Sequence, residues 1–204
     1  GLDRGPITQY FIFLSKAVQG DLGTSYRFDI PVLELVLNRF PATIELALAA
    51  MVFAVMVGMS TGIVSAIWPG TLLDRLVQGA SLLGMAAPTF WVGIMLILLF
   101  AVTLGWFPSF GRGDTVKVGW WSTGLLTAKG WHHIVLPAVT LAVFQLTLIM
   151  RLVRAEMLEV LRTDYIKFAR ARGLSDRAIH FGHALKNTLV PVLTITGLQL
   201  GGLI

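Results

Sequence analysis

The feature that most constrains this chain is a series of long stretches without a charged residue. Residues 46–73 form a run of 28 without Asp, Glu, Lys or Arg, residues 76–111 a run of 36, residues 130–150 a run of 21, and residues 188–204 a run of 17. A helix needs about 20 apolar residues to cross a hydrocarbon core about 30 Å thick. Only 13% of the chain is charged, whereas soluble domains are about 25% charged. The sequence therefore predicts an all-α, polytopic membrane protein.

The first and third stretches each predict one spanning helix. These helices are expected over about Ala42–Trp68 and about Ile134–Leu152, the latter with Pro137 in its first turn, where proline is tolerated. Small residues spaced four apart allow two helix backbones to approach closely. Two such motifs occur, Gly58-x-x-x-Gly62 and Gly197-x-x-x-Gly201.

The second stretch is too long for one straight span, because it would reach about 54 Å at 1.5 Å per residue. Pro88 divides it into a span over Thr89–Phe107 and a segment, Leu76–Ala87, that is either a kinked extension or a helix at the inner surface. The fourth stretch reaches about 26 Å and is interpreted as a span cut short. The chain also begins without Met, so we interpret it as a fragment that lacks its first and last spans.

Loop charges predict the orientation. Eight Lys and Arg residues lie between Arg151 and Asn187, whereas the loop between Leu104 and Ile134 holds three, together with four tryptophans. Positive loops stay in the cytoplasm, and Trp is enriched at membrane interfaces. Residues 1–41 are therefore expected to be an extracytoplasmic N-terminal segment, followed by a transmembrane domain over residues 42–204.

The positive charge of the chain suits a membrane surface. The net charge is +5, most of it in the predicted cytoplasmic loop. Membrane lipid, in the form of anionic inner-leaflet headgroups, is the expected partner of Arg151 and Arg154 at the end of their helix. Nucleic-acid binding would need a basic face on a soluble fold, so no nucleic acid is expected.

The residues that carry enzyme chemistry are sparse. The chain has no Cys, which excludes thiolate metal sites and Cys nucleophiles. It has no G-x-x-x-x-G-K-[ST] loop for ATP phosphates, and His180 and His183 share a helix face without an H-E-x-x-H motif. We therefore expect no catalytic residue, no metal and no cofactor, and a transport subunit rather than an enzyme.

One alternative is an ion-coupled secondary transporter. Such carriers place ionisable residues inside their spans, and here the only one is Glu45, one turn into the first predicted helix. Gln145 is the polar residue in the middle of a span; it either lines a pathway or forms a hydrogen bond to a neighbouring helix. An intramembrane enzyme and a scaffold subunit without transport are further alternatives.

The segment over about residues 153–187 has the pattern of two helices joined by an elbow. Gly173 is placed as the residue after a first helix, where a positive φ is common. Small side chains at Ala169 and Ala171 are expected on the surface, where they leave room for another protein. The first helix is expected to have one apolar face, formed by Met157, Leu161, Tyr165 and Phe168.

Ser175 is expected to cap the second helix, with Leu174 and Ile179 in contact across its first turn. That helix is expected to end near His183 and Lys186, cations that suit a helix C-terminus. Pro191 is then expected to begin the next span. The predicted product is a stiff helix–glycine–helix projection between two spans.

The elbow also resembles a known family. The run Asp164-Tyr165-Ile166-Lys167-Phe168-Ala169-Arg170-Ala171-Arg172-Gly173-Leu174-Ser175, followed by His183-Ala184-Leu185-Lys186-Asn187 and Pro191, resembles the cytoplasmic loop of the dipeptide/oligopeptide permease family. These proteins are inner-membrane permease subunits of binding-protein-dependent ABC importers. The resemblance covers nearly the whole chain, and further segments carry it: Gly20-Asp21-Leu22-Gly23-Thr24-Ser25-Tyr26, Arg39-Phe40-Pro41-Ala42-Thr43, residues 84–90 and Gly105-Trp106-Phe107-Pro108.

The general permease pattern, Glu-Ala-Ala, three residues, Gly, nine residues and Ile-x-Leu-Pro, is matched only at Ala169, Gly173 and Leu185. This departure resembles the peptide-permease variant. The resemblance implies that an ATPase subunit docks on the elbow through residues of the loop. Those residues are Asp164, Tyr165, Ala169, Arg170, Ala171, Gly173, Leu174, Ser175, His183, Leu185 and Asn187.

The resemblance further implies a type I ABC importer transmembrane-domain fold in a bacterial or archaeal inner membrane. The implied partners are ATP-binding cassette ATPase subunits, a second homologous permease and an extracytoplasmic solute-binding protein. The implied function is ATP-driven import of peptides, or of a related solute such as nickel, glutathione or an oligosaccharide.

Overall fold

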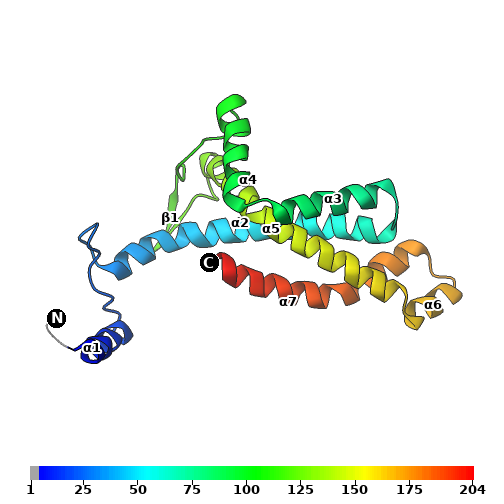
Figure 1. The fold of residues 1–204 in the computed structure, drawn as a ribbon, viewed down its shortest axis with the longest axis horizontal. Helices are drawn as coiled ribbons and strands as arrows, with labels where there is room; N and C mark the ends of the chain where they lie inside the picture. Colours follow the sequence, from blue (N-terminus) through cyan, green and yellow to red (C-terminus); the bar gives the residue numbers. More distant parts are fainter. Residues whose placement is uncertain (1–4) are drawn as a thin grey trace.

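The computed structural model describes residues 5–204, which are mostly helical. The elements, in chain order, are α1 (Pro6–Val18), α2 (Val32–Ile67), α3 (Leu72–Ala86), α4 (Thr89–Leu96), the π-helical η1 (Ile97–Thr103), β1 (Val116–Val118), β2 (Trp121–Thr123), α5 (Ala128–Leu161), α6 (Asp164–Ala171), the π-helical η2 (Ala178–Ala184) and α7 (Leu185–Leu203). Helices α2 and α5 run side by side along the length of the molecule, with α3 and α7 beside them (Figure 1).

The centre of the fold is the contact between α2 and α5. Small residues recur every three or four positions along α2, so they form one stripe on a helix with 3.6 residues per turn. This stripe is buried and consists of Ala47, Ala50, Ala54, Gly58 and Gly62. Ala138, Ala142, Ile149 and Val153 of α5 belong to the same buried core. The absence of large side chains on this stripe lets the two backbones approach closely.

At two positions of the stripe, this close approach requires glycine. A Cβ atom on Gly58 would lie 2.9 Å from the carbonyl oxygen of Leu146, and one on Gly62 would lie 2.7 Å from that of Met150. The expected packing role of the Gly58-x-x-x-Gly62 motif is therefore confirmed. At Gly197 and Gly201 a Cβ would meet no atom of the described residues within 4 Å.

The two long helices exceed their predicted bounds. Helix α2 begins at Val32 rather than Ala42, and α5 runs from Ala128 to Leu161 rather than from Ile134 to Leu152. Pro137 therefore lies in the interior of α5, so the prediction that it sits in the first turn is wrong. By length and composition, α2 and α5 can each cross a membrane.

The segment divided by Pro88 is a sharply bent pair of helices. Helix α3 turns by 106° into the helical segment Thr89–Thr103, and together they can supply a third span. Helix α3 packs against α2 and α5, a contact compatible with both a kinked extension and a helix at the inner surface, so both stay predictions. The predicted span Thr89–Phe107 is too long, because the helix ends at Thr103.

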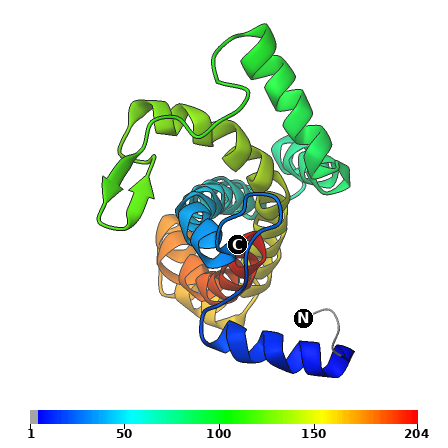
Figure 2. The same ribbon diagram turned by 90° about the vertical axis from the view of Figure 1, so that its left-hand side faces the viewer.

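The extracytoplasmic end, as predicted from charge, contains a small hairpin that was not expected. Strands β1 and β2 pair antiparallel, with Val116 opposite Thr123 and Val118 opposite Trp121. Helix α1 lies across the same end of the helix bundle, and none of its residues is buried (Figure 2). The expected segment of residues 1–41 thus contains α1 and the start of α2.

Glu45 attaches this loop to α2. Its carboxylate is 4% exposed and pairs with the Arg112 guanidinium at 3.2 Å. It also accepts hydrogen bonds from the Trp121 indole N–H at 3.1 Å and the Gly124 backbone N–H at 3.2 Å. We call these four residues the outer cluster. Glu45 therefore lies well inside a helix and under a loop, rather than one turn into a helix as predicted.

The glycine stripe can be tested by adding one methyl group. Gly62→Ala should lower the free energy of unfolding of the full-length protein by about 1–3 kcal/mol, because overpacking forces α2 and α5 apart. The measurement is thermal unfolding in detergent. Gly79→Ala is the control, since a Cβ at this helical position meets nothing within 4 Å. Equal destabilisation by both changes would contradict the assigned contact.

Candidate functional site

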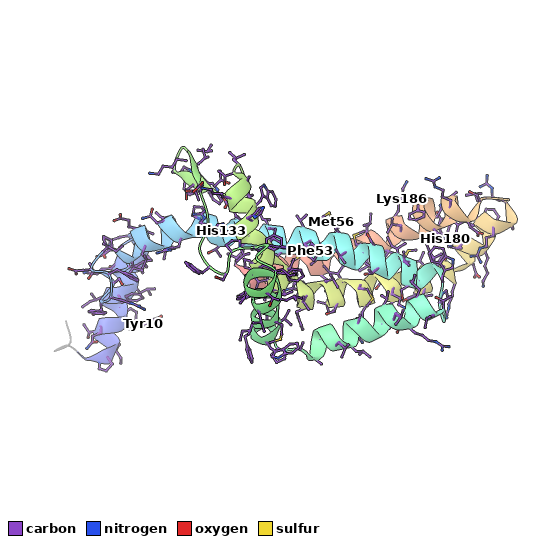
Figure 3. All side chains as sticks on the ribbon, turned by 90° about the horizontal axis from the view of Figure 1, so that it is seen from above. Tyr10, Phe53, Met56, His133, His180 and Lys186 are labelled. Carbon is purple, nitrogen blue, oxygen red and sulfur yellow. The ribbon has the colours of Figure 1, made fainter. Side chains whose placement is uncertain are left out.

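The candidate site is the elbow that loop charge predicts to be cytoplasmic, defined here as residues 162–187. It lies at the end of the molecule opposite α1 and the hairpin (Figure 1). His180 and Lys186 of the elbow are far from Tyr10 and His133, which lie towards the other end (Figure 3). The elbow connects two long helices directly, because α5 ends at Leu161 and η2 continues into α7 without a break.

The first arm of the elbow is the short helix α6. Helix α5 ends at Leu161, and Arg162 and Thr163 separate it from α6. This break changes which residues face inward. Ile166 and Ala169, one turn apart, are buried, whereas Tyr165 and Phe168 are 50% and 63% exposed. The predicted apolar face through Met157, Leu161, Tyr165 and Phe168 is therefore wrong beyond Leu161.

Gly173 forms the bend itself. Its φ is +80°, a value that costs little only for glycine. The Gly173 N–H donates to the Arg170 carbonyl at 2.9 Å, and the Leu174 N–H donates to the Ala169 carbonyl at 3.3 Å. This pair of bonds is the Schellman ending of a helix. The expected role of Gly173 after the first helix is thus confirmed.

Ala169 is not a surface residue. Only 6% of it is exposed, because it packs with Ile166, Leu174 and Ile179 in a small core of its own. The expectation that Ala169 lies on the surface is wrong, while Ala171 is exposed as expected. A small side chain at residue 169 therefore serves packing inside the elbow.

The second arm starts as predicted and then continues further. The Ser175 hydroxyl accepts from the Ala178 N–H at 3.4 Å, and its carbonyl accepts from the Ile179 N–H at 3.0 Å. Leu174 and Ile179 are in the same small core, as expected. The helix does not end near Lys186, however, and Pro191 lies inside α7 rather than at its start. Because η2 and α7 form one continuous helix, Pro191 lies in its interior.

Side chains tie the two arms together. The Tyr165 hydroxyl of α6 is hydrogen-bonded to Nδ1 of His183 in η2. Asp164 pairs with Lys167 at 2.8 Å on the exposed side of α6. Leu185 packs partly against the main core, and Asn187 and Arg170 are exposed. The structure thus brings the predicted elbow residues into one compact unit, of which some form the core and others the surface.

A second polar cluster lies near the elbow, and no sequence motif indicated it. The Asp74 carboxylate near the start of α3 pairs with the Arg154 guanidinium of α5 at 2.9 Å. The Ser65 hydroxyl also donates to Asp74. Arg154 therefore has a protein partner, and the lipid headgroup expected at Arg151 and Arg154 stays a prediction. Arg151 makes its contact with the thioether of Met85 at 2.9 Å.

Gln145 forms a helix–helix hydrogen bond. Its side-chain oxygen accepts from Nε2 of Gln199 at 2.6 Å, which joins α5 to α7. The interpretation that Gln145 forms a hydrogen bond to a neighbouring helix is therefore confirmed. A role in lining a pathway stays a prediction.

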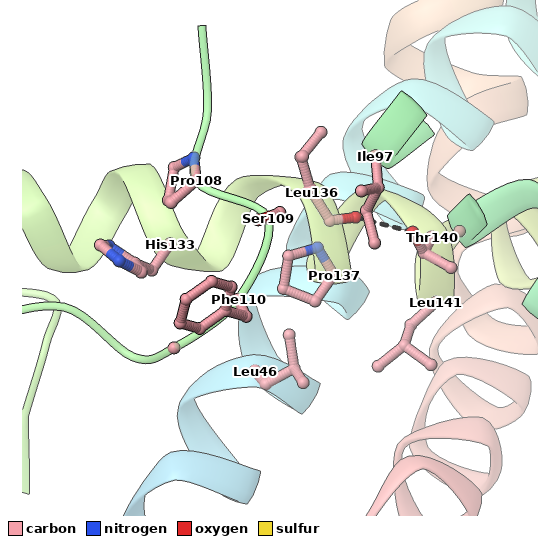
Figure 4. A pocket seen from close by; sticks show the side chains of 12 residues that line it. Leu46, Ile97, Pro108, Ser109, Phe110, His133, Leu136, Pro137, Thr140 and Leu141 are labelled. Atoms are coloured by element: carbon pink, nitrogen blue, oxygen red, sulfur yellow. Dashed lines mark hydrogen bonds between the residues drawn. The ribbon is translucent and has the colours of Figure 1, made fainter. Parts of the chain in front are cut away.

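A cavity of about 400 Å³ lies between α2, α4, α5 and the loop around Pro108–Gly111 (Figure 4). Its walls are mostly apolar, with Phe110, Leu46 and Leu141 among them, and it includes the imidazole of His133 and the hydroxyl of Thr140. The latter two are bonded locally, His133 to the Lys129 carbonyl and Thr140 to the Leu136 carbonyl. The cavity therefore offers an apolar surface rather than a reactive group.

Neither the elbow nor the cavity has the components of an active site. Among residues 5–204, no three His, Asp or Glu side chains lie close enough together to hold a metal ion. What the elbow offers instead is a rigid, exposed bend between two long helices.

Comparison with known protein families matches residues 54–204 to the family described as binding-protein-dependent transport system inner membrane component. This match covers most of the chain. The chain belongs to this family. This match confirms the membrane location and the helical ABC-permease transmembrane domain, and the relatives described next confirm the resemblance to peptide permeases.

Individual members of the permease family align over the whole chain. The di/tripeptide transport system permease protein of Pseudomonas aeruginosa is 42% identical over 216 residues, with 64% of its length covered. The dipeptide transport system permease protein of Alkalihalophilus pseudofirmus is 38% identical, with 65% covered. The glutathione transport system permease protein of Escherichia coli is 37% identical, with 61% covered. The chain thus spans a little under two thirds of these relatives.

The inward face of the elbow can be tested by truncating side chains. Ile166→Ala should loosen the elbow by about 2–5 kcal/mol, because it leaves a cavity in a small core. Hydrogen exchange of the backbone amides between residues 164 and 184 in the full-length protein measures this. Phe168→Ala is the control and should leave exchange unchanged, since that ring is exposed. A larger increase in exchange for Phe168→Ala than for Ile166→Ala would contradict this and support the apolar face predicted from sequence.

Proposed function

We propose that this chain is part of the permease subunit of an ATP-driven importer in a bacterial or archaeal inner membrane. The observation that carries the proposal is the alignment of the whole chain with permease proteins of di/tripeptide, dipeptide and glutathione transport systems. Small peptides are the proposed substrates. Separate ATPase subunits supply the energy, in keeping with a chain that has no phosphate-binding loop.

The elbow is the proposed docking site for an ATPase subunit. Its core residues Ile166, Ala169 and Ile179 hold α6 at a fixed angle, so a force on α6 is carried into the long helices. The proposed contact surface is the exposed side of the bend, where Arg170, Ala171 and Gly173 lie. A Cβ at Gly173 would meet nothing within 4 Å, which leaves space for a partner to approach the backbone.

The mechanism follows from the connections of the elbow. When two ATPase subunits close on ATP, each elbow moves with its subunit, and α5 and α7 move with the elbow. Rigid-body movements of this kind open one side of a transporter and close the other. A second homologous permease completes the pathway, and an extracytoplasmic solute-binding protein delivers the peptide. The exposed side chains of α7, among them Val190, Leu193 and Leu198, offer a surface to neighbouring helices.

The ion-coupled alternative is disfavoured by the pairing of the buried charges. The two carboxylates that are buried among the described residues, Glu45 and Asp74, are each bound by an arginine. A carboxylate that carries a proton or sodium ion through a transport cycle must exchange its partner. The family membership of the chain also favours an energy source in a separate subunit.

Purification of the full-length protein in mild detergent, followed by mass spectrometry of co-purifying proteins, tests the proposal directly. Recovery of an ATPase subunit and a second permease supports it. Repeated recovery of the folded protein by itself would contradict it and favour the ion-coupled carrier.

Gly173→Trp tests the docking surface. The indole meets no neighbouring atom of this chain and would hold a docked partner away from the backbone, while the positive φ strains any side chain at this position. We expect partial assembly of the complex and loss of ATP-driven peptide uptake, at least about tenfold, because the force no longer reaches the elbow. The measurement is uptake of labelled di- and tripeptides into proteoliposomes.

Two controls accompany this change. Gly173→Asn keeps a residue that tolerates positive φ with a much smaller side chain, and it should retain most of the uptake. His180→Ala should leave uptake unchanged, since no metal or docking role is assigned to it. Normal uptake by the Gly173→Trp protein would show that the elbow is not the docking site.

A further inference from the structure

Residues 5–204 contain two buried carboxylate–arginine clusters, one on each side of the middle of α2. The outer cluster, around Glu45, holds an extracytoplasmic loop. The inner cluster consists of Ser65, Gly70, Asp74, Gln78 and Arg154, and it differs because it includes the helix that leads into the elbow. Both clusters are built from the same chemistry, so their different connections can be compared experimentally.

Arg154 binds Asp74 through two hydrogen bonds. Its Nε donates to Oδ1 at 2.9 Å and its Nη2 donates to Oδ2 at 3.0 Å. A planar guanidinium that engages both carboxylate oxygens fixes orientation as well as distance. Because Asp74 is 2% exposed, water cannot easily replace either bond.

The remaining donors around Asp74 come from three other parts of the chain. The Gly70 N–H of the α2–α3 turn donates at 2.8 Å, and the Gln78 amide of α3 donates at 2.9 Å. The Ser65 hydroxyl in the last turn of α2 donates to Asp74 and accepts from Arg154 Nε at 3.0 Å. One carboxylate therefore joins α2, the turn, α3 and α5.

The position of Arg154 connects this cluster to the elbow. Arg154 lies two turns before the end of α5 at Leu161, about 10 Å along the helix axis. A movement of the elbow therefore reaches Arg154 through a short, continuous piece of helix. Without the ion pair, α5 could move at this end while the α2–α3 turn stayed behind.

We propose that Asp74 and Arg154 are positioning residues for transport, which make the cytoplasmic ends of α2, α3 and α5 follow the elbow as one unit. This inference rests on the proposed function. In this proposal the Asp74–Arg154 pair transmits movement of the elbow to α2 and α3, in addition to stabilising the fold. Loss of the pair therefore separates ATP hydrolysis from peptide import in a complex that still assembles.

The experiment uses the full-length protein in its purified complex with ATPase subunits and binding protein, reconstituted in proteoliposomes. The quantity measured is the number of labelled di- or tripeptides imported per ATP hydrolysed. Asp74→Asn should lower this ratio by about fivefold or more, the lower end of coupling between sites. Arg154→Lys, which keeps the charge but loses the planar fork, should give an intermediate ratio.

Glu45→Gln is the matched control, because it makes the same carboxylate-to-amide change in the outer cluster of the same helix. It should leave the ratio within about twofold of the parent. A single change can leave a buried charge without a partner and prevent assembly, whereas removal of both charges is better tolerated. The double variant Asp74→Asn with Arg154→Gln is therefore measured as well, and its ratio should also be low.

The inference is overturned if the assembled Asp74→Asn protein or the double variant keeps the parental ratio. It is also overturned if Glu45→Gln lowers the ratio as much as Asp74→Asn, since any loosening of α2 would then suffice. Failure of the proposed function looks different: the parent complex would show no ATP-dependent peptide import, or Gly173→Trp would import normally. In either case, this inference falls with the proposed function.

Discussion

The close approach of α2 and α5 is the contact on which the rest of the structure depends. Lipid tails are as apolar as leucine, so helices in a membrane associate through close packing and hydrogen bonds rather than through a hydrophobic driving force. The stripe from Ala47 to Gly62 brings the α2 backbone against α5. Helix α3 packs on this pair, and α7 contacts both of its members. Each neighbouring element thus takes its position from one interface made of small residues.

Polar clusters fix the ends of this interface, where packing alone would allow the helices to slide. A buried carboxylate is expensive unless its hydrogen-bonding capacity is filled. Asp74 and Glu45 each receive donors from an arginine and from a backbone N–H. Because those donors come from separate segments, the bonds form together only when the segments are in register. The clusters therefore contribute specificity of arrangement, one at the cytoplasmic end and the other at the extracytoplasmic end as predicted from loop charge.

The helices could be predicted from sequence because an apolar stretch of about 20 residues without charge is typical of a membrane span. The close packing at Gly58-x-x-x-Gly62 and the bend at Gly173 could be predicted because each depends on glycine having no side chain. The ends of the helices were predicted less well, because α5 and α7 contain Pro137 and Pro191 in their interiors. The buried face of α6 was missed because the break at Arg162 and Thr163 resets the helical phase. Asp74 and Arg154 are 80 residues apart, and no local pattern indicates that two such residues meet.

The two arms of the elbow are not free to move independently. Tyr165 and His183 join α6 to η2, and further from the elbow Gln145 of α5 is bonded to Gln199 of α7 at 2.6 Å. Buried residues of α5 and the residues Ala184 and Val192 share the main core between these points. A displacement of the elbow must therefore move α5 and α7 together, unless it breaks an amide–amide bond inside the membrane. Helix α5 is joined to α2 by glycine contacts and to α3 by Asp74, so under the proposed function the unit that responds to the elbow is the whole set of long helices rather than the loop alone.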